Sequence, residues 1–188
     1  INNEVYRLNA FGETTRLFSL FMNVKHTYQS IVDKSTLRAI EFKMSIQEGK
    51  HFIFDSIIFN NNPTLEEKSY NDILSIFYKL RCLDDVEILN TDTLFFSYYY
   101  NGQIFNSYAL NLGKEIVKTK FGELEAIKLA PLLERGRMFR STTGALVWVT
   151  ADRMHIPVKI EFPILVGSIY VNLISYKKTL HDLNQVLK

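Results

Sequence analysis

The chain has 188 residues, which fits one domain, and a hydrophobic content of 47%, which is ample for a packed core. Its formal net charge of +2 argues against nucleic acid or an anionic membrane as a partner. The single cysteine, Cys82, excludes an intramolecular disulfide. No window reaches the roughly 18 apolar residues that span a bilayer as a helix, so we expect no transmembrane segment in this chain.

The N-terminal third predicts a four-stranded antiparallel meander. In the third run, Phe42, Met44 and Ile46 alternate with polar residues, the period of a strand with one wet face. Glu48-Gly49-Lys50 is a tight hairpin signal. The four predicted strands are residues 5–10, closed by Gly12, and then 18–28, 37–47 and 52–59.

Residues 69–81 predict the one strong helix of the chain. Its apolar residues form a single stripe at helical spacing, namely Ile73, Leu74, Ile76, Phe77 and Leu80. Ser69 is the expected N-cap, with Asp72 three residues later in the position of a capping-box partner. We expect this helix to cover or plug a curved sheet.

Strands resume after this helix and continue nearly to the end of the chain. Asn101-Gly102 predicts a two-residue type I′ hairpin turn, because both central residues of that turn need positive φ. Further strands are predicted at residues 94–100, 103–112, 116–120, 124–129, 146–149, 158–162, 164–166 and 169–173. The pattern predicts an all-β fold with one covering helix, a curved antiparallel sheet forming an open or partial barrel. Residues 1–176 form one predicted domain, and residues 177–188 a tail or short helix.

Five segments of the chain carry a family resemblance. They are DILSIFYKLR (72–81), VKTKFGELEAIKLAP (117–131), VWVTAD (147–152), IPVKIEF (156–162) and VGSIYVNL (166–173). Together they resemble the bacterial exported proteins called domain of unknown function 3108, over roughly residues 1–176. The resemblance implies a location in the periplasm or at the outer membrane. It implies no catalytic residues, because the family has no established activity.

Motifs for catalysis or for metal binding are absent from the sequence. The four histidines lie far apart, and neither a zinc-binding spacing, a GxSxG nucleophile motif nor a glycine-rich phosphate loop is present. We therefore expect no metal, no cofactor and no enzymatic activity. An envelope hydrolase would need two or more of Tyr78, Arg81, Asp152 and His155 to converge in one cleft.

Two groups of residues are candidates for ligand binding. Tyr78 and Arg81 match the helix motif of the family and lie three residues apart on one helical face. Alternatively, Arg81 pairs with an acid such as Asp84 or Asp152 and fixes the helix to the sheet. The second group, Arg135, Arg137 and Arg140, would suit an anionic headgroup or a protein partner. Its alternative is a solvated loop.

The aromatic run Tyr98-Tyr99-Tyr100 allows two interpretations. A stacking platform for nucleic acid would need a basic groove, which the net charge does not provide. Cross-strand aromatic packing is the favoured interpretation.

Three functions follow as hypotheses. The first is an envelope protein that binds an apolar small molecule or lipid on a concave, aromatic-lined face, by analogy with the open barrels that carry lipoproteins across the periplasm. The second is an interaction or scaffold module that contacts an envelope protein through a strand edge or the arginine loop. It predicts a packed interior and an exposed apolar or basic patch. The third, an envelope glycan or lipid hydrolase, has the least support.

Overall fold

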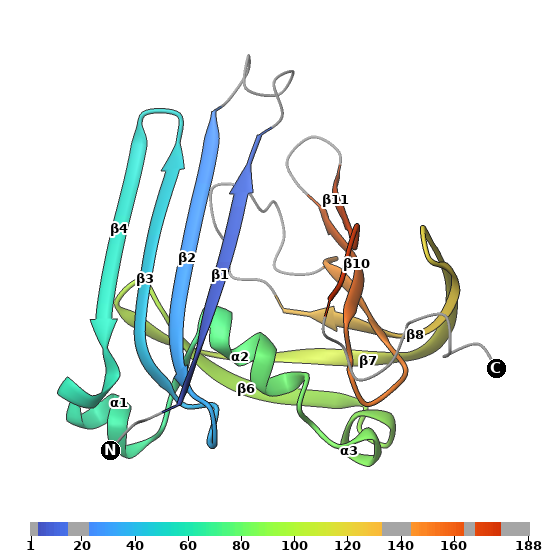
Figure 1. Cartoon of the computed structure of the whole chain (residues 1–188), viewed down its shortest axis with the longest axis horizontal. Coiled ribbons are helices and arrows are strands. Elements are labelled where there is room, and N and C mark those ends of the chain that lie inside the picture. The colour runs from blue at the N-terminus through green and yellow to red at the C-terminus, as the bar shows by residue number, and fades with distance from the viewer. Residues whose placement is uncertain (1–3, 15–22, 133–143, 164–167, 178–188) are drawn as a thin grey trace. The chain divides into compact units, whose positions relative to one another are not determined.

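The computed structural model describes residues 4–14, 23–132, 144–163 and 168–177 (Figure 1). Its Cα trace divides into two compact units. Unit 1 comprises Ile1–Lys79 and Ser97–Phe105, and unit 2 comprises Leu80–Phe96 and Asn106–Lys188. Each unit is described below by itself.

Unit 1 is built on a four-stranded antiparallel sheet in the order β1-β2-β3-β4. This is the predicted meander. The bounds are β1 Val5–Glu13, β2 Val24–Asp33, β3 Ala39–Glu48 and β4 His51–Ile58. β1 continues past Gly12, which pairs with His26 instead of ending the strand. Residues 18–22 of the predicted second strand lie outside the described residues.

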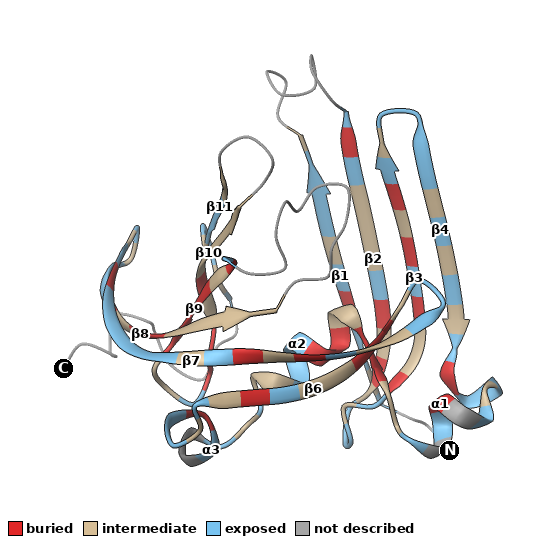
Figure 2. Ribbon diagram, turned by 180° about the vertical axis from the view of Figure 1, so that it is seen from behind, coloured by how far each residue is buried: buried red, intermediate tan, exposed pale blue. Residues whose placement is uncertain are grey.

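The two faces of this sheet differ in polarity because alternate residues point to opposite sides. On β3, Phe42, Met44 and Ile46 are buried, and they form a core with Phe59, Leu65 and Tyr99. We call this side the core face. The opposite side, the outer face, carries Lys43 and Gln47, which are exposed. Figure 2 shows buried residues alternating with less buried ones along β3. The alternation of apolar and polar residues along β3 therefore determines which face of the sheet packs against the unit 1 core.

A helical connection follows β4. It consists of the 3₁₀ turn η2 (Phe59–Asn61), α1 (Pro63–Glu67), the short strand β5 (Asn71–Asp72) and α2 (Ile73–Leu80). The predicted start of α2 is wrong. Ser69 has φ +53° and lies before the helix, whereas Asp72 Oδ1 accepts the backbone N–H groups of Leu74 and Ser75. Asp72 is therefore the N-cap, and Ser75 Oγ accepts the Asp72 N–H in return.

The tip of a long hairpin completes unit 1. β6 (Thr93–Tyr100) and β7 (Gln103–Thr119) are neighbouring strands that join at Asn101 and Gly102. These two residues have φ of +46° and +78°, as the predicted type I′ turn requires. β5 pairs with β6 in parallel. β5 and its parallel pairing were not predicted from the sequence.

Unit 2 contains most of the remaining strands. The sheet order is β11-β10-β9-β8-β7-β6-β5, and every described pairing from β7 to β11 is antiparallel. The further elements are α3 Asp85–Leu89, β8 Gly122–Pro131, β9 Leu146–Thr150, β10 Pro157–Pro163 and β11 Ser168–Asn172. β7 is one strand of 17 residues where the sequence predicts two, because an irregularity at Gly113 lets the pairing with β8 continue.

Both faces of the central strands of unit 2 are buried. Leu124, Ala126 and Trp148 belong to one core cluster, and Ile127, Val147 and Val149 belong to another that includes Ile88 of α3. Residues of β9 are buried on both faces of the sheet, and the sequence of this strand is accordingly a nearly continuous apolar run. Residues 164–166, predicted as a strand, lie outside the described residues.

The predicted fold class is confirmed. The chain is mostly β and largely antiparallel, and neither sheet closes into a barrel among the described residues, in agreement with an open or partial barrel. α1 and α3 are short helices that the sequence analysis did not predict. The single domain over residues 1–176 stays a prediction, and residues 178–188 of the predicted tail lie outside the described residues.

Candidate functional site

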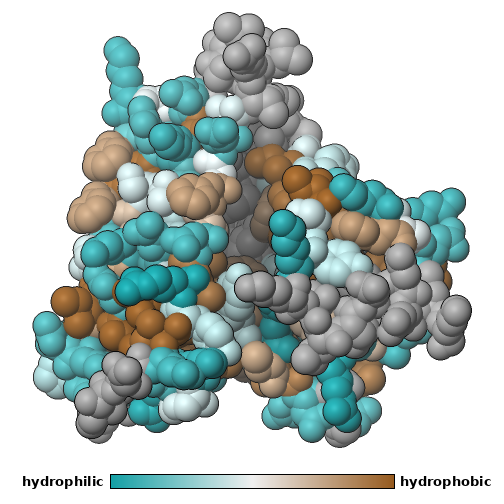
Figure 3. Space-filling view, in the orientation of Figure 1, coloured by the Kyte–Doolittle hydropathy of each residue, from teal (hydrophilic) through white to brown (hydrophobic). Residues whose placement is uncertain are grey.

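The edge strand β4 is the most exposed apolar element of unit 1. β4 ends the order of its sheet and pairs only with β3 among the described residues. Phe52 and Phe54 on its outer face are each 62% exposed, and Ile58 is also exposed. Figure 3 shows this apolar surface along β4, at the left of the view, amid hydrophilic side chains. An open edge with outward aromatic side chains is a template for pairing with another strand.

The hairpin that precedes β4 determines which of its amides face the free edge. Glu48 pairs with His51 across the two-residue turn at Gly49, which has φ +61°. Such a turn is closed by a hydrogen-bonded pair, and hydrogen-bonded pairs alternate along an antiparallel ladder. The backbone groups of His51, Ile53, Asp55 and Ile57 therefore point to β3, and those of Phe52, Phe54, Ser56 and Ile58 point outward.

The core face of β4 carries a carboxylate in an apolar setting. Asp55 Oδ1 accepts a hydrogen bond from Tyr99 Oη at 3.2 Å, whereas Asp55 Oδ2 is buried and has no hydrogen-bond donor among the described residues. Burial, with Asp55 next in importance, raises the pKa of Tyr99 to about 12. A buried carboxylate oxygen without a donor is costly.

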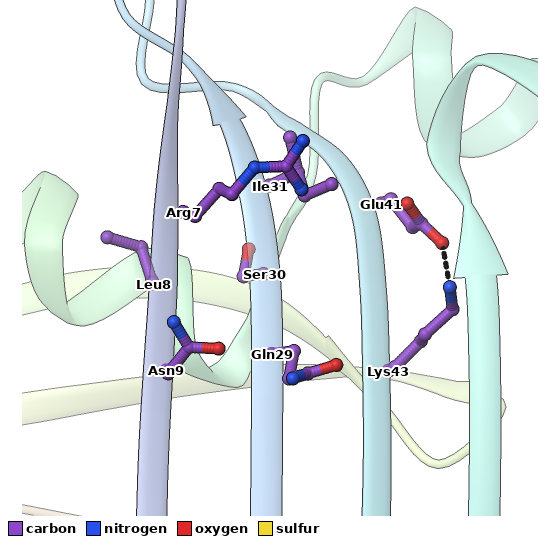
Figure 4. Close-up of a pocket in the computed structure, with 8 residues that line it drawn as sticks. All are labelled: Arg7, Leu8, Asn9, Gln29, Ser30, Ile31, Glu41 and Lys43. Carbon is purple, nitrogen blue, oxygen red and sulfur yellow. Dashed lines mark ion pairs between the residues drawn. The ribbon is translucent and has the colours of Figure 1, made fainter.

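The outer face of the same sheet holds a polar pocket of about 190 Å³. Figure 4 shows Arg7, Asn9, Gln29 and Lys43 lining it, with an ion pair between Lys43 and Glu41. The pocket is smaller than the roughly 300–1,000 Å³ typical of sites for drug-sized ligands. Its polar lining suits neither an acyl chain nor another large apolar ligand.

Unit 1 also contains a buried polar cluster around Asp72. Ser30 Oγ and Ser75 Oγ both donate to Asp72 Oδ2, at 2.6 and 2.8 Å. Burial raises the pKa of this carboxyl group above its ordinary value, against the opposing effect of these hydrogen bonds. Asp72 is fully buried and caps α2, so its role is to join the helix to β2. The hydrogen bonds of this cluster cap the helix, so we assign it a structural role.

Arg81 lies in unit 2 and contacts the β9–β10 connection. Its guanidinium Nε and Nη2 donate to the carbonyl of Met154 at 3.2 and 3.1 Å. The His155 ring Nδ1 lies 3.1 Å from the Arg81 carbonyl oxygen. Arg81 therefore holds the connection through contacts with its backbone, and the predicted pairing of Arg81 with an acid stays a prediction.

Asp152 and His155 are part of the same connection. Asp152 Oδ1 accepts from Thr150 Oγ1 at 2.5 Å and from the Met154 N–H, and the His155 N–H donates to the Asp152 carbonyl. His155 is only 1% exposed. Three of the four residues named for a hydrolase thus meet in a hydrogen-bonded turn, in which His155 is buried and Arg81 and Asp152 are partly buried.

Of the other predicted site residues, the structure describes only Tyr78. Tyr78 lies on α2 in unit 1 and its side chain is exposed. Arg135, Arg137 and Arg140 lie outside the described residues. The proposed ligand-binding role of these residues stays a prediction.

The aromatic run pairs across its own hairpin. Tyr98 stacks on Phe105 with ring centroids 5.7 Å apart, and Tyr100 also contacts Phe105. Tyr98 and Tyr99 are buried. The favoured interpretation, cross-strand aromatic packing, is confirmed.

Unit 2 has a charged row across four strands. Lys128, Trp148 and Lys159 lie opposite one another on β8, β9 and β10. Both ammonium groups lie over the indole ring, at 5.3 and 4.4 Å from its centroid, and the indole N–H donates to Glu115. Glu115 also pairs with Lys128, so one of the two lysine charges in this row has an anionic partner.

Neither a metal site nor a membrane-spanning helix is found in the part of the chain that the structure describes. No cluster of three or more His, Cys, Asp or Glu side chains has ligand geometry there. No helix is long and apolar enough to cross a bilayer.

Comparison with known proteins identifies the family. The model of the family described as "Protein of unknown function (DUF3108)" matches residues 1–174. The chain belongs to this family. The family predicted from the sequence is thus confirmed over nearly the whole chain. No curated protein and no solved structure matches this DUF3108 member.

The exposed edge at β4 was not predicted from the sequence. Residues 52–59 read as a return strand, but a strand becomes an edge only through the order of the whole sheet, which local patterns do not encode. The alternation of Phe52 and Phe54 with Ile53 and Asp55 was the available signal. This alternation places apolar residues on both faces of the strand, with Ile53 on the core face and Phe52 and Phe54 on the outer face, where they are available to a binding partner.

Proposed function

We propose that this DUF3108 protein is a non-enzymatic interaction module of the cell envelope that binds an extended segment by strand addition at β4. The observation behind this proposal is the exposed pair Phe52 and Phe54 on an edge strand, at two of the alternate positions whose amides point away from β3. Main-chain hydrogen bonds would supply affinity, and the two rings would supply specificity. The envelope location rests on the family resemblance.

The packing of unit 1 favours this function over an internal cavity. Phe42 and Phe59 on the core side are almost fully buried, so side chains fill this face of the sheet. A packed interior combined with an exposed apolar edge is what the interaction hypothesis predicts. Three outer positions of β4 are exposed and apolar, namely Phe52, Phe54 and Ile58, although Glu41 and Lys43 of β3 lie opposite Ile58 and Ser56. Burial of apolar area would therefore stabilise a complex at this edge.

Site-specific photo-crosslinking in cells tests the proposal. A benzophenone side chain replaces Phe54, and the matched control carries it at Ile116 of unit 2, which is 57% exposed. We expect a discrete crosslinked product from position 54 that is lost when Ser56→Pro removes an outward N–H. Equal labelling from both positions, or no product from position 54, would overturn the proposal.

A second candidate, binding of an apolar ligand or lipid, is favoured by one surface of unit 2. Tyr108, Leu110 and Leu112 alternate along one face of β7, and Phe95 of β6 packs on Tyr108 while remaining 80% exposed. Such a surface would hold an acyl chain on a face instead of in a cavity. Native mass spectrometry of protein purified from the envelope tests it. A stoichiometric lipid mass that is lost in Leu112→Lys would support this candidate, and a clean apo mass would remove it.

A further inference from the structure

β4 carries a side-chain pattern that is complementary to itself in the antiparallel direction. Outward-pointing amides can pair only with outward-pointing amides, so two copies of β4 pair about a twofold axis at a residue position. Axes at Ile53, Phe54 and Asp55 each pair several residues of the strand. They differ in which side chains they place opposite one another.

The axis at Ile53 pairs aromatic with aromatic. It places Phe52 opposite Phe54 of a second copy, and the symmetry repeats this pair on the other side of the axis. Both rings are exposed on the outer face in one copy, so both would lose water in the pair. Aromatic pairs directly opposite each other are among the most favourable cross-strand contacts.

The same axis also places a basic side chain opposite an acidic one on the core face. It places the exposed His51 of one copy opposite Asp55 of the other, twice by symmetry. An imidazole opposite an acidic side chain is a favourable cross-strand pair, because it can donate an N–H to the carboxyl group. An axis at Phe54 would instead face Asp55 with Ile53, and an axis at Asp55 would oppose two carboxylates. In both alternatives, the residue opposite Asp55 is a less favourable cross-strand partner than His51.

We propose that the occupant of the β4 edge is a second copy of this chain, paired antiparallel about Ile53 to form an eight-stranded sheet from two four-stranded sheets. This inference rests on the proposed role of β4 and names its partner. The ladder is isologous and closed, so association stops at the dimer.

Cysteine scanning tests the axis in the full chain with Cys82→Ser. In a pair centred on Ile53, position 53 faces itself at a non-hydrogen-bonded site with Cα atoms about 4.5 Å apart, within reach of a disulfide. Position 54 lies diagonal to its own copy, about 7–8 Å away or more, beyond that reach. We expect Ile53→Cys to form a disulfide-linked dimer and Phe54→Cys and Asp55→Cys not to. Preferential crosslinking at 54 or 55 would overturn the proposed register.

Charge substitutions test the His51–Asp55 contact by sedimentation velocity. His51→Glu places a glutamate opposite Asp55 at both symmetry-related contacts of the dimer, and it should weaken association about tenfold. His51→Lys should change the association by less than about threefold. Asp55→Asn retains an acceptor for Tyr99, and in that background the effect of His51→Glu should shrink. Equal effects of His51→Glu in both backgrounds would overturn the contact.

Failure of this inference is distinguishable from failure of the proposed function. A chain that stays monomeric up to high micromolar concentration, yet crosslinks through position 54 to a different protein, overturns the dimer and leaves the interaction module standing. A monomeric chain without any specific crosslink at position 54 overturns both. A crosslink at position 54 between two copies, with the disulfide at position 53, supports both.

Discussion

Ser30 Oγ donates a hydrogen bond of 2.6 Å to Asp72 Oδ2, joining strand β2 to the N-cap of helix α2 across 42 residues of sequence. Both side chains are buried. The contact places the start of α2 on the core face of the unit 1 sheet. It also compensates in part for burying a carboxyl group.

Removal of the Ser30 hydroxyl should destabilise the fold. Ser30→Ala deprives the buried Asp72 of one donor, and the expected loss in free energy of unfolding is about 1–3 kcal/mol. Urea denaturation measures it. Ser45→Ala on the outer face of the same sheet is the control, with an expected change within about 0.5 kcal/mol. Equal losses for the two variants would contradict the role assigned to Ser30.

The charge state of Asp72 should make stability depend on pH. Burial raises its pKa in the folded state above the ordinary value, so folding favours the protonated carboxyl group. The stability from this group is fully present below the unfolded pKa and is lost as pH rises through the folded pKa. Asp72→Asn stays neutral throughout. The stability of the native protein relative to this variant should therefore fall as pH rises from about 4 toward neutrality.

Denaturation of both proteins at a series of pH values measures this difference. Groups other than Asp72 are common to the two chains and cancel in the comparison. A difference that stays constant with pH, or that grows in favour of the native protein as pH rises, would show that the carboxyl group is not raised in pKa by burial.

Gly102 should be needed for its backbone conformation alone. A Cβ atom at this position meets nothing within 4 Å, but φ is +78° in the type I′ turn. Gly102→Ala should cost about 1 kcal/mol. Gly12 in β1 has equal space and no positive φ, so Gly12→Ala should be neutral or slightly stabilising. Thermal unfolding compares the two, and equal losses would contradict the turn assignment.

The indole of Trp148 should control the ionisation of Glu115. Its N–H donates to the Glu115 carboxylate, and this contact, more than that of Lys128, lowers the pKa of Glu115. In an NMR titration, Trp148→Phe should raise the Glu115 midpoint more than Lys128→Ala does. The opposite order would assign the effect to the lysine.

The sequence predicted those parts of the fold that short-range patterns determine. Asn101-Gly102 and Glu48-Gly49-Lys50 specify hairpins because positive φ is needed at defined positions, and both turns are present. Alternation in β3 likewise identified Phe42 and Met44 as core residues. These signals act within a few residues of sequence.

Contacts between distant segments account for what the sequence did not predict. Ser69 resembled an N-cap, but Asp72 has a buried hydroxyl donor on β2 in addition to the helix N–H groups, so the helix begins later. The site residues show the same limit. Arg81 donates to the carbonyl of Met154, 73 residues away, a contact that no local pattern in the sequence indicates. The exposed edge at β4 likewise follows from sheet order alone.

Amide hydrogen exchange along β4 tests the central claim, that this edge binds a strand, most directly. In dilute protein, the amides of Phe52, Phe54 and Ser56 point outward and should exchange rapidly, whereas those of Ile53 and Asp55 are bonded to β3 and should be protected. When the partner is engaged, by raising the protein concentration or adding envelope extract, the account predicts new protection at Phe52, Phe54 and Ser56. Exchange at these three amides that stays rapid under every condition would contradict it.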